Sequence, residues 1–179
     1  MESLHCLAVV PVYEPMKGNV CICYGFTGEV QKQAVTVRAQ MRRFFREHRL
    51  DEKEYEKDSR RILGITKNLP MAYSTDCIFV PVKVRVPVTR GDGAYAYVRL
   101  EGIRSVEDHR LHLCTGEPFD CLQSRRSLLE SLSRARILLA VLESEEARRS
   151  AERRLVNYAI RHAAHLHARR QDADEPKKS

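Results

Sequence analysis

The chain has 179 residues, of which 43% are hydrophobic and 31% are charged, and its formal net charge is +7 at neutral pH. This hydrophobic content excludes an intrinsically disordered chain, and the length is enough for one domain with a sizeable core. No apolar run approaches the ~20 residues that a membrane-spanning helix needs, so we expect no membrane partner. The basic balance favours a polyanionic partner.

The start of the chain, MESLHCLAVVPVYEP, does not have the pattern of a secretory signal peptide. Glu2 stands where positive charge is expected, and the apolar run is short and alternating. Six cysteines are scattered through segments with strand character. Cys21 and Cys23 would share one face of a strand, but no second pair has zinc-type spacing. We therefore predict a cytoplasmic protein with reduced, mostly buried thiols and no metal or cofactor.

The first forty residues predict strands. Residues 4–13 alternate loosely, residues 14–19 form a turn, and residues 20–26 are rich in β-branched and apolar side chains. A second turn follows at residues 27–29. This part of the chain is expected to begin an antiparallel sheet.

From Val35 the hydrophobic period changes to that of a helix. Val37, Met41, Phe44, Phe45 and His48 recur at helical spacing and form one apolar stripe. A second stripe of the same predicted helix holds only arginines at its basic positions: Arg38, Arg42, Arg46 and Arg49. The pattern predicts a helix that packs through its phenylalanines and presents arginines to the solvent.

A second helix is predicted for residues 51–63. Asp51 is its expected N-cap, Glu54 occupies the capping-box position, and Gly64 would end it. Arg60 and Arg61 lie in its last turn, where cations also interact favourably with the helix dipole. Structural and DNA-binding roles for this pair are both open.

The rest of the chain predicts more strands and then helices. Residues 77–82 and 94–100 have strand character, and residues 109–123 form a hairpin with Thr115 and Gly116 at its tip. Ser127 and Glu130 form an S-x-x-E capping box before a leucine-rich face, which continues without Gly or Pro to residue 170. The expected fold class is α+β, mainly antiparallel sheet and hairpins with packed helices and a long C-terminal helical segment.

The sequence contains no catalytic constellation. It has no glycine-rich phosphate loop, no nucleophile elbow, and no histidine in a context that pairs it with a nucleophile. His162 and His165 lie one turn apart, but His162 shares the apolar stripe of Leu155 and Leu166, which favours a packed histidine over a metal ligand. We predict that the protein is not an enzyme.

Positive charge is regional. Residues 31–70 hold eleven Lys and Arg against six Asp and Glu, and residues 144–170 hold seven against three, whereas the first thirty residues are net acidic. Such regional basicity is typical of an electrostatic footprint for nucleic acid.

The order of these segments resembles the ComK-type competence transcription factors of low-GC Gram-positive bacteria. The resemblance spans Leu7 to Leu142 and includes Ser124, Ser127, Leu128 and Arg134 in the last segment. The matching segments, in chain order, are CLAVVPVYEPMKG, TVRAQMRRFFREH, SRRILGITKNLPMAY, CIFVPV and HLCTGEPFDCLQSRRSLLESLSRARILL. The resemblance implies a DNA-binding domain over residues 1–143. Residues 144–170 are then a C-terminal helical extension, and residues 171–179 a disordered tail.

The resemblance implies a transcriptional activator that binds A·T-rich promoter DNA. We expect a homodimer or a dimer of dimers on DNA, because a single small domain rarely covers enough duplex to select a promoter and two-fold sites are usually bound by dimers. RNA polymerase and a proteolytic adaptor are further partners that the resemblance suggests. Arginine suits the narrow minor groove of A·T-rich DNA. The basic side chains predicted to contact DNA lie in three places: the two predicted helices, the loop after the second helix, and the residues just before the leucine-rich helix. They are Arg38, Arg42, Arg43, Arg46, Arg49, Arg60, Arg61, Lys67, Arg125 and Arg126.

Three alternatives remain open on the sequence alone. Residues of the hairpins, Arg85, Arg99 and Arg104, are other candidates for the DNA contact. RNA binding would require the same basic patches. A protein interaction module would use the long C-terminal helix, with Leu155, Tyr158 and Leu166 at a dimer contact.

Overall fold

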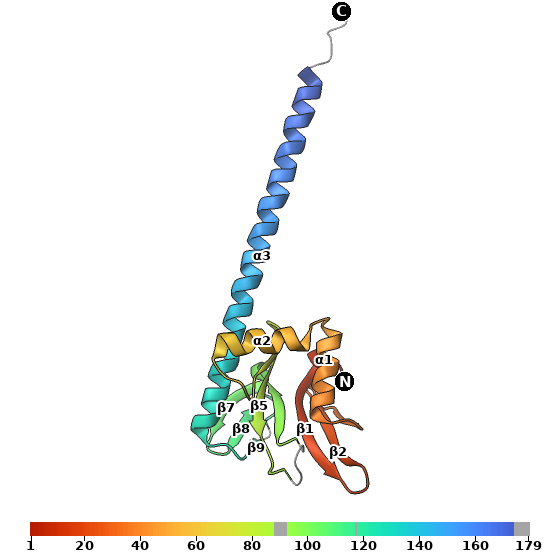
Figure 1. Ribbon diagram of the computed structural model, residues 1–179, viewed down its shortest axis with the longest axis vertical. Coiled ribbons are helices and arrows are strands. Elements are labelled where there is room, and N and C mark those ends of the chain that lie inside the picture. The colour runs from red at the N-terminus through yellow and green to blue at the C-terminus, as the bar shows by residue number, and fades with distance from the viewer. Residues whose placement is uncertain (88–92, 117, 174–179) are drawn as a thin grey trace, which may run out of the picture. The chain divides into compact units, whose positions relative to one another are not determined.

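The structure is a computed structural model that describes residues 1–87, 93–116 and 118–173, with side chains described in the last helix as far as residue 160. It contains two antiparallel sheets and three α-helices within these residues, so the predicted α+β class is confirmed (Figure 1). The chain divides into two compact units, Met1–Ala140 and Val141–Ser179. The first of these units holds both sheets.

The larger sheet has six strands, all paired antiparallel, in the order β3-β2-β1-β6-β5-β4. Its strands are β1 (Cys6–Glu14), β2 (Gly18–Gly25), β3 (Val30–Gln33), β4 (Met71–Ser74), β5 (Cys77–Lys83) and β6 (Tyr95–Arg99). The N-terminal hairpin therefore lies beside a strand from much later in the chain. β1 and β6 form the centre of the sheet.

The smaller sheet has the order β7-β8-β9. Its strands are β7 (Ile103–Glu107), β8 (Arg110–Leu113) and β9 (Pro118–Asp120). The predicted hairpin of residues 109–123 corresponds to β8 and β9, which pair antiparallel around a turn that contains Gly116 at φ 90°. Short 3-10 helices precede β1 (Ser3–His5) and follow β6 (Leu100–Gly102).

Alternating side chains of the large sheet fill two separate cores. On one face, Val9 and Phe79 pack with Met41, Phe44 and Phe45 of α1 (Val37–Glu47). On the other face, residues of β1, β5 and β6 pack against the small sheet and Leu128 of α3 (Arg125–Ala173). The second helix, α2 (Glu52–Leu63), joins the α1 side through Tyr55. The six-stranded sheet thus separates α1 and α2 from the small sheet.

α3 begins earlier than the sequence predicted. The hydroxyl of Ser124 accepts a hydrogen bond from the Ser127 backbone N–H at 3.4 Å, so Ser124 takes the capping role expected of Ser127. The Ser127 carbonyl accepts a bond from the Ser131 hydroxyl, and Glu130 pairs with Arg126. Ser127 and Glu130 therefore both lie inside the first turns of the helix, where Glu130 forms an ion pair and the Ser127 hydroxyl accepts a hydrogen bond from the Gln123 amide at 3.0 Å.

The second unit is described only as a helix. α3 continues through Ser144 to Ala173, so residues 171–173, expected in the tail, are helical. Residues 174–179 of the predicted tail lie outside the described residues, as do the side chains of His162, His165 and Leu166. Every side chain from residue 143 to residue 160 is exposed. No helix in the described part of the chain is long and apolar enough to cross a membrane.

Candidate nucleic-acid interface

The arginines of α1 are exposed because the opposite side of the helix is buried. Thr36 caps the helix, its hydroxyl accepting a hydrogen bond from the Ala39 N–H at 3.2 Å. Four members of the predicted apolar stripe, Val37, Met41, Phe44 and Phe45, are at most 5% exposed, whereas the fifth, His48, is half-buried at the C-cap of the helix. With 3.6 residues per turn, the remaining side of the helix must face the solvent.

We call the exposed guanidinium groups of α1, from Arg38, Arg42, Arg43 and Arg46, the arginine face. Arg42 forms an ion pair with Glu52 of α2 at 2.8 Å, and Arg43 contacts the Gln40 amide oxygen at 3.5 Å. Within the described residues, Arg38, Arg43 and Arg46 have no carboxylate partner. Three of the four guanidinium groups of the arginine face are therefore exposed without a neutralising carboxylate in the described residues.

Arg49 does not belong to the helical stripe on which the sequence pattern placed it. α1 ends at Glu47, and Arg49 adopts a left-handed backbone with φ 57°. The Arg49 N–H donates to the Arg46 carbonyl at 3.1 Å, and the Leu50 N–H donates to the Phe45 carbonyl at 2.9 Å. This is the Schellman geometry that usually places glycine at the left-handed position. The Arg49 side chain is exposed and extends from the cap of the helix.

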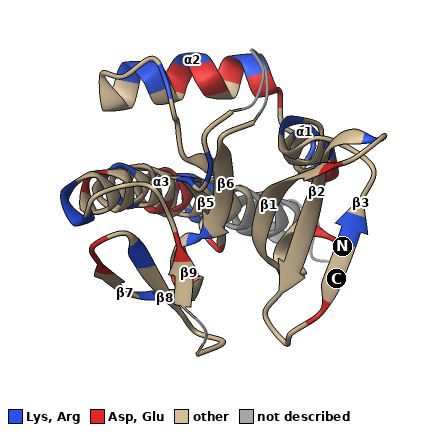
Figure 2. Cartoon of the chain, turned by 90° about the horizontal axis from the view of Figure 1, so that it is seen from below, with Lys and Arg blue, Asp and Glu red and all other residues tan. Residues whose placement is uncertain are grey.

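α2 begins and ends as predicted. The Asp51 carboxylate accepts hydrogen bonds from the Lys53 and Glu54 backbone N–H groups, and Gly64 adopts φ 65° at the C-cap. The Glu54 side chain, predicted to complete a capping box, instead forms an ion pair in which its carboxylate lies 3.5 Å from the Lys57 ammonium group. Acidic and basic residues are interspersed along α2 (Figure 2).

The two predicted DNA contacts on α2 are both paired within that helix. Arg60 lies 2.6 Å from Glu56, and Arg61 lies 3.2 Å from Asp58. Lys67, in the loop after α2, is exposed and has no carboxylate partner among the described residues. Among Arg60, Arg61 and Lys67, it is Lys67 that has no neutralising carboxylate in the described part of the chain.

Arg125 and Arg126 lie apart from the arginine face, at the start of α3. The backbone N–H of Arg125 donates to the Asp108 carboxylate at 2.9 Å, and its guanidinium donates to the Val106 carbonyl at 3.4 Å. Arg126 pairs with Glu130 at 3.3 Å. Together with Leu63 at the end of α2, these two arginines line a shallow pocket. The predicted contacts are thus divided between the arginine face and a corner between α2 and α3.

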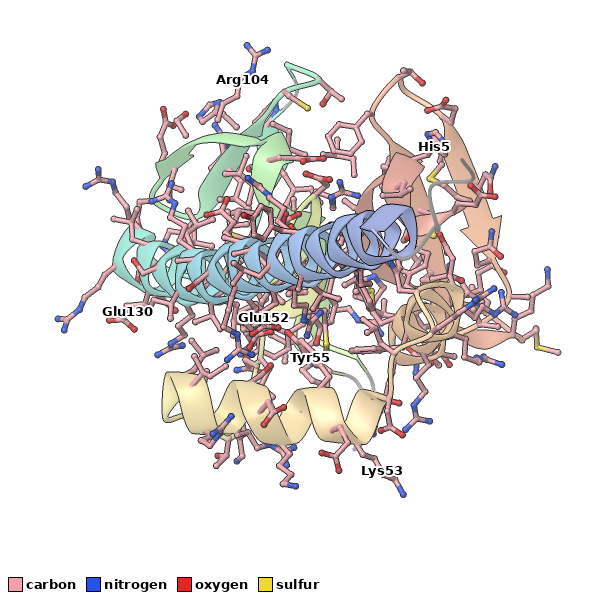
Figure 3. All side chains as sticks on the ribbon, turned by 90° about the horizontal axis from the view of Figure 1, so that it is seen from above. His5, Lys53, Tyr55, Arg104, Glu130 and Glu152 are labelled. Atoms are coloured by element: carbon pink, nitrogen blue, oxygen red, sulfur yellow. The ribbon has the colours of Figure 1, made fainter. Side chains whose placement is uncertain are left out.

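The three alternative arginines have different environments. Arg99 is 2% exposed and donates to the Ser3 carbonyl at 2.8 Å, so it cannot contact DNA in this fold. Arg85 is half-buried and donates to Asn19 and to the Gly93 carbonyl, each at 2.7 Å. Arg104 is exposed on β7 and points away from the protein (Figure 3).

The buried position of Arg99 has a clear physical reason. Its guanidinium also donates to the Cys77 thiol at 3.4 Å and pairs with Glu101 at 2.5 Å. The rings of Phe26 and Phe79 lie 5.3 and 5.5 Å from its central carbon. Carbonyl acceptors, one carboxylate and two aromatic faces together stabilise a charge that would otherwise be costly to bury.

Lys53 is an exposed cation that the sequence analysis did not select. It lies on the outer side of α2, whereas Tyr55 of the same helix points inward (Figure 3). Its ammonium group has no carboxylate partner within the described residues. The sequence did not indicate Lys53, because acidic residues surround it and the net charge of a segment does not show which of its cations lack a partner.

The cysteines lie in the core that α1 covers, apart from the two near the small sheet. Cys6, Cys21, Cys23 and Cys77 are fully buried, and Cys114 is half-buried. Hydrogen bonds to Cys23, followed by burial, raise the pKa values of Cys6 and Cys21 far above the usual range. Burial raises the pKa of Cys77 to about 11. No group of metal-binding side chains with suitable geometry occurs in the described part of the chain.

Comparison with known proteins gives no match among protein-family models, curated proteins or solved structures.

Proposed function

We propose that the protein is a transcriptional regulator that binds double-stranded DNA through the arginine face of α1. The observation that carries this proposal is the state of Arg38, Arg43 and Arg46, which are exposed and without carboxylate partners in the described residues. Phosphate groups are the polyanionic partner that such an array attracts, with release of counterions from the DNA. The arginines project from a helix anchored in the core, so their spacing is fixed by the backbone.

A·T-rich duplex is the preferred form of DNA in this proposal. Arg side chains enter the narrow minor groove of such sequences, where the negative potential is enhanced and where the planar guanidinium sheds its weak hydration readily. The basic residues of α1 are all arginines. The resemblance of the chain to ComK-type regulators supports the same choice.

A homo-oligomer completes the proposal. Leu155, Val156, Tyr158 and Ile160 of the second unit are 58–69% exposed within six residues of one helix. Such a concentration of exposed apolar side chains marks an interaction surface.

The test compares two double variants that each remove two arginines. Arg43→Ala/Arg46→Ala changes the arginine face, and Arg60→Ala/Arg61→Ala changes the paired arginines of α2. Alanine favours helix, so both variants should keep the fold. For the first, the slope of log K against log salt should flatten by up to ~2 units, because each lost phosphate contact releases about one fewer counterion. The second should change the slope by much less.

The measurement is a fluorescence anisotropy titration of A·T-rich duplex, G·C-rich duplex and structured RNA at several salt concentrations. An unchanged slope for the α1 variant with an intact circular dichroism spectrum would contradict the proposal. A larger loss for the α2 variant would place the interface at the corner of α2 and α3. Tighter binding of RNA would identify an RNA-binding protein, and sedimentation of the saturated complex would show whether more than one chain binds each site.

A further inference from the structure

A pocket of about 460 Å³ lies between α1, α2 and the beginning of β6, within the first unit. Its apolar wall comes from Val37, Met41 and Phe45 of α1 together with Leu69 and Met71 before and within β4. Tyr95 and Tyr97 of β6 form the opposite side. Pockets of about 300–1,000 Å³ with mainly apolar walls are typical of sites for small organic molecules.

The charged groups of the pocket leave one cation uncompensated. Glu52 pairs with Arg42 at 2.8 Å, and Glu56 pairs with Arg60 at 2.6 Å. Arg38 also lines the pocket and has no carboxylate partner among the described residues. The described lining is therefore mainly apolar, and Arg38 is its exposed cation without a carboxylate partner.

Tyr97 supplies a neutral donor close to that charge. Its side chain is half-buried, and no hydrogen bond holds its hydroxyl group within the described residues. Burial raises the pKa of Tyr97 to about 12, so the phenol stays protonated at neutral pH, although the Arg38 charge acts in the opposite direction. By contrast, the Tyr95 hydroxyl accepts a bond from Asn68 at 2.9 Å. Tyr97 is thus the ring of β6 that is available to an acceptor in the pocket.

We propose that this pocket binds a small organic monoanion, an apolar body that carries one carboxylate. The carboxylate accepts hydrogen bonds from the Arg38 guanidinium and the Tyr97 hydroxyl, and the apolar body packs against Met41, Phe45 and Met71. A dianion would leave one charge unpaired beside Glu52 and Glu56, and a neutral ligand would leave Arg38 without a partner. The proposal is independent of DNA binding, because the site is complete without nucleic acid.

The experiment is isothermal titration calorimetry of the full chain, without DNA, against 2-naphthoate, indole-3-acetate and octanoate. The neutral isostere 2-naphthamide is the ligand control. We expect at least one acid to bind one to one, and the amide to bind about tenfold more weakly than 2-naphthoate because it lacks a charge-assisted hydrogen bond. Failure of all three acids to bind at millimolar concentration overturns the proposal.

Three substitutions locate the binding site. Arg38→Gln should weaken binding of the acid about tenfold and leave the amide unchanged, because only the acid uses the guanidinium charge. Arg46→Gln removes the same charge from the same helix outside the pocket and should leave both ligands unchanged. Thr66→Trp, at an exposed lining position, should fill the pocket and abolish binding of both. Equal losses for Arg38→Gln and Arg46→Gln, or unchanged binding in Thr66→Trp, would place the acid elsewhere and overturn the proposal.

Discussion

Helices α1 and α2 carry the same number of basic residues, but they differ in how many of these residues are paired with carboxylates. α1 holds four arginines against one glutamate, a net charge of +3, whereas α2 holds four basic residues against four acidic ones. Arg60 and Arg61 of α2 are paired, but only Arg42 of α1 has a carboxylate partner in the described residues. Counting charges along a segment therefore does not identify a binding face, because neutralisation is decided by geometry.

The two helices also differ in how firmly they are anchored. α1 buries five side chains, and α2 buries only Ser59 completely, with Tyr55 half-buried. The Tyr55 hydroxyl donates to the Pro70 carbonyl at 2.6 Å and accepts from the Ala72 N–H at 2.9 Å. α1 is part of the core, and α2 is attached to it mainly through one aromatic residue. The arginine face is consequently built on the more rigid of the two helices.

The largest expected effect concerns this difference in anchoring. Phe44 is 1% exposed and lies 5.7 Å from the stacked ring of Phe79, so Phe44→Ala should lower the free energy of unfolding by ~3–5 kcal/mol. Ile62 of α2 is 37% exposed, and Ile62→Ala should cost less than ~1 kcal/mol. Urea titrations followed by circular dichroism measure both values. Similar losses for the two variants would mean that α2 belongs to the core as much as α1 does.

A smaller effect is expected at the C-caps, where the two helices use different residues in the same left-handed conformation. Gly64→Ala in α2 should cost ~1 kcal/mol, because a Cβ is strained at φ 65° although no atom obstructs it. Arg49→Gly, directly after the C-cap of α1, should stabilise the fold by ~0.5 kcal/mol, since the relief of strain is partly offset by the flexibility of glycine in the unfolded chain. Thermal unfolding compares the pair. Destabilisation by Arg49→Gly would show that the arginine side chain makes a contribution larger than its backbone strain.

The smallest expected effect comes from a substitution that increases the number of unpaired arginines on α1. Glu52→Gln removes the carboxylate that neutralises Arg42 and should steepen the salt dependence of duplex binding by up to ~1 unit. Glu54→Gln is the matched control, because it removes the same charge from the same turn but releases Lys57 of α2 instead. Anisotropy titrations measure both slopes. If the control steepens the slope as much as Glu52→Gln does, net charge matters and the identity of the freed arginine does not.

Much of the fold follows from local patterns in the sequence. The stripe from Val37 to Phe45 is predictable because a helix with one buried face must repeat apolar residues at its own period. Asp51 and Gly64 delimit α2 through capping interactions that involve only neighbouring residues. Strands β3, β4 and β7 escaped prediction because they are short, and β3 and β7 have few apolar positions. The S-x-x-E pattern predicts Ser127 as the capping residue of α3, and it fails because the pattern does not reveal which serine precedes the first helical turn.

The candidate interface was less predictable because it depends on contacts between distant segments. The sequence identified Arg42 and Arg46 as equivalent, but only the fold brings Glu52 within 2.8 Å of Arg42. The alternation of side chains along β6 does not distinguish Arg99 from a residue that faces the solvent. Arg99 is buried because its guanidinium contacts Ser3 and Cys77. No local pattern encodes such pairings. The pocket beside Arg38 has the same character, since its walls come from four separate segments.

The contact between Arg99 and Ser3 constrains the order in which the chain can fold as it is synthesised. β1 and β2 can pair as soon as they leave the ribosome, but the other edge of β1 is completed only by β6, and the Arg99 contact spans 96 residues. At roughly 5–20 residues per second, the apolar strand Cys6–Glu14 keeps one edge unpaired on the order of seconds. Such an edge can pair with other chains, and newly made copies are therefore most exposed to aggregation before β6 emerges.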